Sequence, residues 1–151
     1  MVQATTAEES DLLLEARRLA GTAVMAAGPT VIDDVCVPAG QLAAMLAAVQ
    51  EVSADSGIPI ATVAHAGDGN LHPVLMLPDL TPGTITRAMA VGERLCDHAR
   101  RLGGTITGEH GVGVLKRTWV QQQLGPVSLA VHHAIKAALD PAGILNPGRS
   151  F

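Results

Sequence analysis

Residues 58–77 read IPIATVAHAGDGNLHPVLML, two apolar runs on either side of a short polar segment. The runs over 58–66 and 71–77 have the composition of β-strands. The segment between them, Gly67-Asp68-Gly69-Asn70, is typical of a turn. This stretch therefore predicts a β-hairpin.

The turn decides how two histidines are placed. A two-residue type I′ turn at Asp68-Gly69 pairs His65 with His72, so that both side chains point to one face with Cβ atoms roughly 4.5–5.5 Å apart. Two imidazoles so placed can share one metal ion, whereas a register shifted by one residue sends the rings to opposite faces. The simpler alternative is a tight turn whose two histidines are half-exposed and bind nothing.

A second polar cluster, Gly108-Glu109-His110-Gly111-Val112-Gly113, places two ionisable side chains next to each other between glycines. Adjacent side chains of an extended segment point in opposite directions. Glu109 is then a candidate third ligand beside the two histidines, which leaves an open metal position for a substrate, and His110 is a candidate base. A solvated loop is the alternative for this segment taken alone.

The rest of the chain alternates helical and extended patterns. Thr5 with Glu8, or Thr6 with Glu9, fits a capping box before a helix over 7–26, and Thr81 fits the cap of a later helix that ends near Gly103. The other expected elements are a strand over 30–38, helices over 40–56, 116–124 and 126–139, and a turn-rich tail over 140–151. These patterns predict an α+β fold with a small, largely antiparallel sheet of about three strands, an incomplete ferredoxin-like cap, covered by helices and followed by a helical C-terminal tail.

The composition excludes several classes of protein. Of the 151 residues, 48% are hydrophobic and 1% aromatic, so we expect one domain with an aliphatic core. A net charge of −4 without a basic stripe argues against nucleic acid as a partner. The sequence has no signal-peptide or transmembrane pattern, and Cys36 and Cys96 form no C-x-x-C pair, so we expect a cytoplasmic protein without a disulfide framework.

Other chemical motifs are incomplete. Gly67-x-Gly69 lacks the third glycine of a dinucleotide fingerprint, and the segment 108–113 is followed by Val114 where a phosphate-binding loop needs lysine. A G-x-S-x-G elbow is not found. His98, His132 and His133 fall on expected helices, where packed or solvated imidazoles are more usual than ligands.

Three segments in order carry a family resemblance. They are 65–72, 104–116 (GTITGEHGVGVLK) and 139–149 (LDPAGILNPGR), and the stretches 14–17 and 34–38 also fit. Together they resemble the C-terminal portion of the FAD-linked 2-hydroxyacid dehydrogenases, which include the flavin subunit of bacterial glycolate oxidase, D-lactate dehydrogenases and D-2-hydroxyglutarate dehydrogenase.

The resemblance implies roles for individual residues. His65, His72 and Glu109 match the ligands of a divalent metal, usually zinc, manganese or iron, and His110 matches the catalytic base. Arg17 matches an arginine that holds the substrate carboxylate. Two asparagines fall in motifs that lie near the flavin, Asn70 and Asn146.

The resemblance also implies that FAD and the metal are bound by different domains. Residues 1–151 correspond to one FAD-linked oxidase C-terminal domain, and the N-terminal half that binds FAD is absent from this sequence. We therefore expect a metal-binding catalytic domain that oxidises a small 2-hydroxy acid only with an FAD-binding domain or subunit as partner. The alternatives are a non-catalytic metal-binding or interaction remnant of such an enzyme and, with less support, a stand-alone metal hydrolase.

Overall fold

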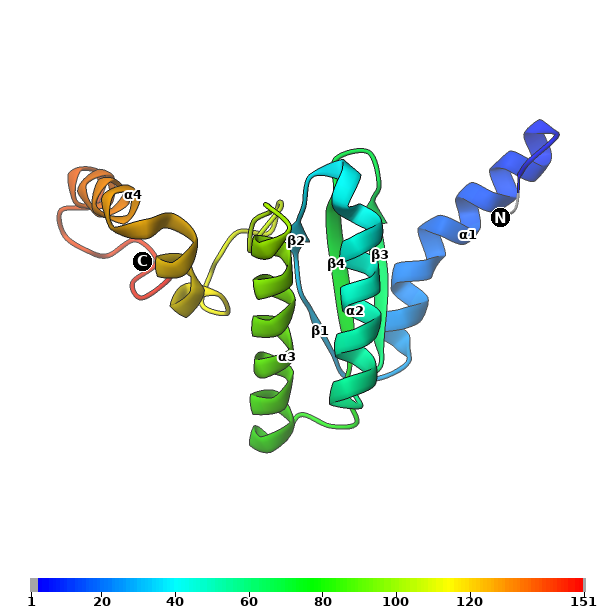
Figure 1. The fold of residues 1–151 in the computed structure, drawn as a ribbon, viewed down its shortest axis with the longest axis horizontal. Coiled ribbons are helices and arrows are strands. Elements are labelled where there is room, and N and C mark those ends of the chain that lie inside the picture. Colours follow the sequence, from blue (N-terminus) through cyan, green and yellow to red (C-terminus); the bar gives the residue numbers. More distant parts are fainter. Residues whose placement is uncertain (1–2, 151) are drawn as a thin grey trace.

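The computed structural model describes residues 3–150, which form helices and strands in nearly the expected order (Figure 1). The helices are α1 (Ala7–Ala26), α2 (Leu42–Ser56), α3 (Pro82–Arg101) and α4 (Arg117–Leu139), with a 3-10 turn, Ala39–Gln41, before α2. The strands are β1 (Thr30–Ile32), β2 (Val35–Cys36), β3 (Ile60–His65) and β4 (Asn70–Met76). The predicted α+β class is confirmed, and residues 140–150 contain turns and bends as expected.

The sheet is built around β4. β3 pairs with one edge of β4, and β1 and β2 pair end to end with the other edge, all of them antiparallel. Because β1 and β2 share one edge of β4, the sheet is three strands wide. The single strand expected over 30–38 is broken at Asp33 and Asp34. Both of these aspartates are only 2% exposed, and their carboxylates bind groups that lie outside the sheet.

The hairpin forms in a different register from the predicted one. His65 pairs with Asn70, and His72 pairs with Val63, so the predicted pairing of the two histidines is wrong. A type I′ turn needs a positive φ at both central residues, whereas Asp68 keeps a negative φ and its carboxylate accepts a hydrogen bond from the Asn70 N–H at 3.1 Å. Because the register differs by two residues, both histidines still point to the same face.

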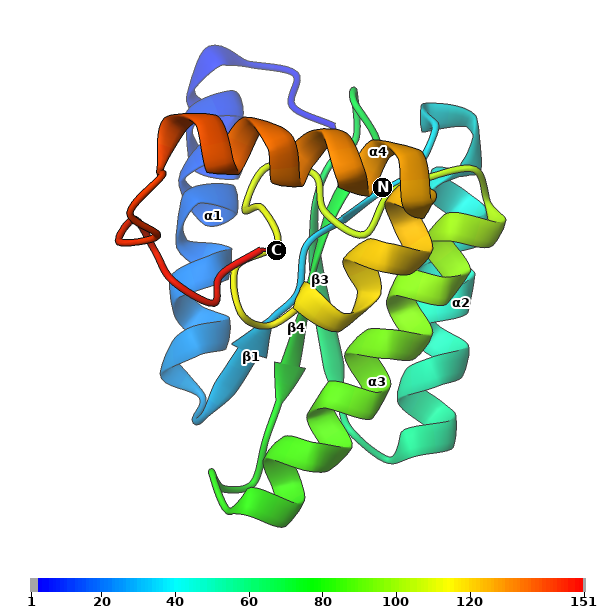
Figure 2. The ribbon, with the colours of Figure 1, turned by 90° about the vertical axis from the view of Figure 1, so that its left-hand side faces the viewer.

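Helices α2 and α3 lie side by side on one face of the sheet, where the core forms (Figure 2). Thr81 caps α3 as expected, accepting a hydrogen bond from the Thr84 N–H. The core is mainly aliphatic, as the composition predicts, and it includes Trp119 of α4. Cys96 is also buried there, and burial raises the pKa of its thiol to about 12, so it behaves as a small apolar side chain.

Helices α1 and α4 extend away from the sheet in opposite directions (Figure 1). α1 has the predicted bounds and the capping box of Thr6 and Glu9, yet none of its residues is buried. α4 is interrupted at Gly125, whose φ of 69° and ψ of 170° are not helical, so its two parts correspond to the two helices expected on either side of this glycine. Within residues 3–150, no helix is long and apolar enough to cross a membrane.

Candidate metal centre

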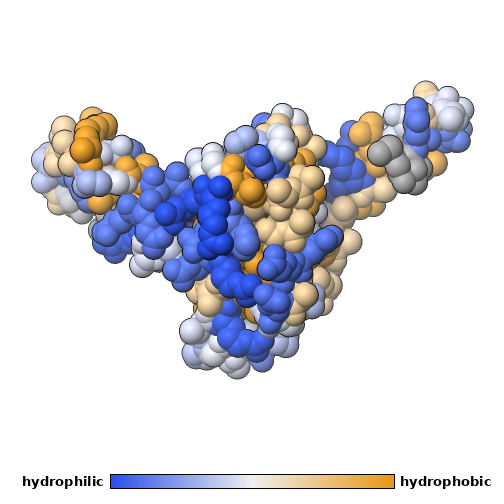
Figure 3. Space-filling view, in the orientation of Figure 1, coloured by the Kyte–Doolittle hydropathy of each residue, from blue (hydrophilic) through white to orange (hydrophobic). Residues whose placement is uncertain are grey.

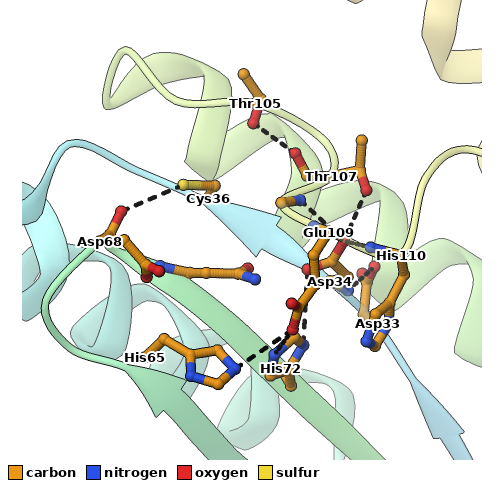
Figure 4. Close-up of polar contacts among 12 residues, drawn as sticks. Asp33, Asp34, Cys36, His65, Asp68, His72, Thr105, Thr107, Glu109 and His110 are labelled. Carbon is orange, nitrogen blue, oxygen red and sulfur yellow. Dashed lines mark hydrogen bonds and ion pairs between the residues drawn. The ribbon is translucent and has the colours of Figure 1, made fainter.

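Three side chains converge beside the β3–β4 hairpin (Figure 4). Nε2 of His72 lies 3.1 Å from Oε1 of Glu109, and Nε2 of His65 lies 3.3 Å from the same oxygen. The two imidazole rings meet edge to face with their centroids 5.2 Å apart. The structure thus brings together the three residues predicted as ligands, from β3, β4 and the loop after α3.

The spacing of these donor atoms suits a metal ion. With bonds of about 2.0–2.1 Å and angles between about 90° and 109°, two donors on one ion lie about 2.8–3.4 Å apart. The separations of 3.1 and 3.3 Å fall in this range, and one ligand atom from each of the three residues lies within 4.8 Å of the others. Two imidazoles and a carboxylate are a donor set that zinc, manganese and iron all accept.

The loop that carries Glu109 is held by one buried carboxylate. Oδ2 of Asp34 accepts hydrogen bonds from the Thr107 hydroxyl at 2.6 Å and from the N–H groups of Gly108, Glu109 and His110 at 2.8, 3.1 and 2.9 Å. Burial raises the pKa of Asp34, but these hydrogen bonds and the charge of Lys116 outweigh it and lower the pKa below its ordinary value. Asp34 therefore stays an acceptor and fixes the backbone at the site.

Sequence reasoning gave Asp34 no role, although a signal was present. Two adjacent aspartates interrupt the apolar run Thr30-Val-Ile-Asp-Asp-Val-Cys-Val37. A charged residue that the chain buries needs a partner. The acidic pair therefore indicated a buried polar network, but not which distant segment completes it.

A buried ion pair fixes the far end of the same loop. Nζ of Lys116 lies 2.6 Å from Oδ1 of Asp33, and both side chains are 3% exposed. The same ammonium group donates hydrogen bonds to the carbonyl oxygens of Asp34 and, at 2.5 Å, Ile106. The two aspartates between β1 and β2 thus hold both ends of the segment 107–116.

His110 lies beside the candidate ligands. Its ring stacks on that of His72, with centroids 4.7 Å apart and planes 14° from parallel. His110 is exposed, which leaves its ring accessible to a substrate. Asp34, His72 and His110 form a second, overlapping group whose ligand atoms lie within 4.8 Å of one another.

Asn70 lies under the same loop. It is 5% exposed, and a Cβ added to Gly108 would lie 2.2 Å from its Oδ1 atom. Position 108 therefore requires glycine, because the backbone passes directly over the Asn70 amide. The predicted place of Asn70 near a flavin stays a prediction.

The structure does not bring Arg17 or Asn146 to this cluster. Arg17 is exposed on α1, and its side chain has no hydrogen bond or ion pair within residues 3–150. Asn146 has a φ of 48° in the C-terminal tail, where it lines a surface cavity of about 430 Å³ with Lys136 and Arg149. The roles predicted for both residues stay predictions.

Comparison with known proteins identifies the family of the chain. Residues 1–150 match the family model of the FAD linked oxidases, C-terminal domain. The chain belongs to this family. The match covers both polar segments of the site and the two aspartates that hold the loop.

Curated relatives extend the comparison. The chain is 40% identical over 149 residues to glycolate oxidase subunit GlcD of Bacillus subtilis strain 168, covering 98% of this chain and 32% of that protein. It is 36% identical over 118 residues to the subunit of the same name from Escherichia coli K12, covering 78% and 24%. It is 34% identical over 145 residues to a probable mitochondrial D-lactate dehydrogenase of Danio rerio, covering 94% and 29%. The chain thus spans a third or less of the length of these relatives.

Proposed function

We propose that this chain is the substrate-side, metal-binding domain of an FAD-dependent dehydrogenase that oxidises a D-2-hydroxy acid or glycolate to the 2-oxo acid. The observation that carries the proposal is the convergence of His65, His72 and Glu109, with His110 stacked beside them. Membership of the FAD-linked oxidase family and the names of the relatives, glycolate oxidase subunit and D-lactate dehydrogenase, support the substrate class.

Each side chain has its own chemical role in this proposal. His65, His72 and Glu109 would hold a divalent ion of zinc, manganese or iron, which would supply the Lewis acid that makes the substrate hydroxyl more acidic. His110 takes the hydroxyl proton on a ring nitrogen, while stacking on His72 keeps its ring beside the ligands. Arg17 lies on α1 outside this cluster, so it would bind the substrate carboxylate only with α1 in a different position. FAD held by the partner would supply the acceptor for the α-hydrogen, which leaves the substrate as a hydride.

The exposed surface of the chain supports an FAD-binding partner. α1 exposes Leu12 and Leu19 by 62% and 57%, and α4 exposes Val127 and Leu139 by 78% and 76%. Figure 3 shows apolar residues on both projecting arms, over α1 and over α4. Side chains of this kind suit coverage by another domain or subunit. The cytoplasmic location expected from the sequence stays a prediction.

Reconstitution tests the proposal. The chain is co-purified with the part of Bacillus subtilis GlcD that lies outside the matched region, then supplied with FAD, a divalent metal, and glycolate or D-lactate. We expect metal-dependent bleaching of the flavin absorbance by the substrate. His110→Asn should lower the bleaching rate by about 10²–10⁴-fold, the usual contribution of a general base. The matched control is His98→Asn, which changes a histidine of α3 outside the cluster.

Two results contradict the proposal. The first is equal bleaching rates in the presence and absence of metal. The second is stoichiometric metal binding with no bleaching by any 2-hydroxy acid although FAD is retained, which instead favours the non-catalytic metal-binding remnant.

A further inference from the structure

Two buried polar atoms face each other behind the candidate metal centre. Oδ1 of Asp34 and Nδ1 of His72 lie 3.6 Å apart, and neither has a hydrogen-bond partner within the described residues. Asp34 is 2% exposed, and the His72 side chain is 12% exposed. Leaving both atoms unpaired is costly, and a small ring movement brings them to hydrogen-bonding distance.

The two ring nitrogens of His72 face different groups. Nε2 points to the oxygen of Glu109, and Nδ1 points to Asp34 (Figure 4). A neutral imidazole carries one proton, so one nitrogen donates a hydrogen bond while the other keeps the lone pair that binds metal. A carboxylate opposite Nδ1 favours the proton there and leaves the lone pair on Nε2.

We propose that Asp34 is the positioning residue of this site, holding His72 as the Nδ1–H tautomer while its other oxygen holds Glu109 and His110 through their backbone N–H groups. The inference rests on the metal centre proposed above. In this inference the Asp34 carboxylate orients two ligands, His72 and Glu109, and the candidate base, His110. Asp34 acts through these residues and does not itself bind the ion.

A second metal ion is the rival occupant of the space between Asp34, His72 and His110. His72 would then have to give both ring nitrogens to metal and lose its last proton. A hydrogen bond to Asp34 instead satisfies both unpaired buried atoms without an ion. The four donors already on Oδ2 also fix the carboxylate so that Oδ1 faces the ring.

Asp34→Asn separates the two roles of the carboxylate. The amide oxygen can replace Oδ2 as the acceptor for the loop, which places the NH₂ group opposite His72. A donor facing Nδ1 favours the Nε2–H tautomer and blocks the metal-binding lone pair. The matched control is Asp33→Asn, which weakens a buried contact with Lys116 next to the site but faces no histidine of the cluster.

The tautomer can be measured without metal by ¹⁵N NMR of histidine-labelled protein, at a pH well above the ordinary histidine pKa of about 6.5. The full chain carries Glu109→Ala in every sample, because Glu109 would otherwise compete for a proton on Nε2. The signals of His72 are assigned from their loss in His72→Gln. We expect mainly Nδ1–H in the Glu109→Ala chain and with added Asp33→Asn. Added Asp34→Asn should shift the tautomer ratio toward Nε2–H by more than about tenfold, as the loss of a hydrogen bond to a charged group predicts.

Metal affinity gives the second readout, with Co²⁺ as the probe and Glu109 restored. Asp34→Asn should weaken binding by about 10–100-fold, and Asp33→Asn should cause no comparable loss. Mainly Nε2–H in the Glu109→Ala chain, or equal tautomer shifts in both asparagine variants, overturns the inference. If the tautomers behave as expected but the unaltered chain binds no Co²⁺, the hydrogen bond between Asp34 and His72 stands and the proposed metal centre fails. If Co²⁺ binds but Asp34→Asn does not change the tautomer ratio of His72, the proposed metal centre stands and the role inferred for Asp34 fails.

Discussion

Lys116→Met removes a buried ammonium group and leaves the Asp33 carboxylate without its partner. The two groups are 2.6 Å apart, each on a side chain only 3% exposed. Breaking such a pair from one side costs about 3–5 kcal/mol, because the remaining charge stays buried. The carbonyl oxygens of Asp34 and Ile106 also lose their donor, which places the loss at the upper end of this range.

Urea unfolding measures this loss directly. The chain has one tryptophan, Trp119, which is 6% exposed, so its fluorescence should report unfolding of the core. We expect Lys116→Met to lower the free energy of unfolding by about 3–5 kcal/mol with little change in the urea slope. Far-UV circular dichroism should give the same midpoint if unfolding is two-state.

The double variant separates charge burial from packing. Lys116→Met with Asp33→Asn removes both charges. The double variant should therefore lose clearly less free energy of unfolding than the sum of the losses in the two single variants. A loss below about 1 kcal/mol in Lys116→Met, the usual size for an exposed pair, would refute the reasoning. So would strict additivity in the double variant.

Two further perturbations test the loop and the tail. Gly108→Ala places a methyl group 2.2 Å from Asn70 Oδ1, so it should lower the free energy of unfolding in urea by about 1–3 kcal/mol. Adding Asn70→Ser should recover part of this loss. An unchanged free energy of unfolding in Gly108→Ala would contradict the close approach. The hydrogen bond from Lys136 lowers the pKa of Asp140, against burial and with help from the N–H groups of residues 144–145. Tail attachment is therefore complete above the ordinary carboxyl pKa of about 3.9 and is lost as pH falls through the lowered folded-state value. Hydrogen exchange at residues 144–145 should be slow at neutral pH and fast in Asp140→Asn; equal rates in both proteins would exclude this role.

Much of the fold is readable from local pattern. The capping box of Thr6 and Glu9 fixes the start of α1, and Thr81 with Pro82 fixes the start of α3. The face of the two histidines was also predicted, although their register was not. Face depends only on whether the register shift is odd or even, whereas the register itself depends on the turn, and Asp68 closes that turn through its side chain.

The contacts of Asp33 and Asp34 that support the site could not be predicted from local sequence pattern. Asp34 binds groups 73 to 76 residues further along the chain, and its neighbour Asp33 binds Lys116. Spacing along a strand does not encode such long-range pairs; they depend on how α3 returns the chain to the sheet. The exposure of α1 was likewise not predictable, because helical spacing marks an apolar face but not what covers it.

Metal analysis of the purified full chain tests the central claim most directly. After removal of metal and reloading with Zn²⁺, Mn²⁺ or Fe²⁺ under anaerobic conditions, we expect about one ion per chain, with anomalous scattering that locates it between His65, His72 and Glu109. His72→Ala should abolish tight binding, and His98→Ala should leave it unchanged. A chain that retains no ion with any of the three metals, or an ion located away from these three side chains, would contradict the account.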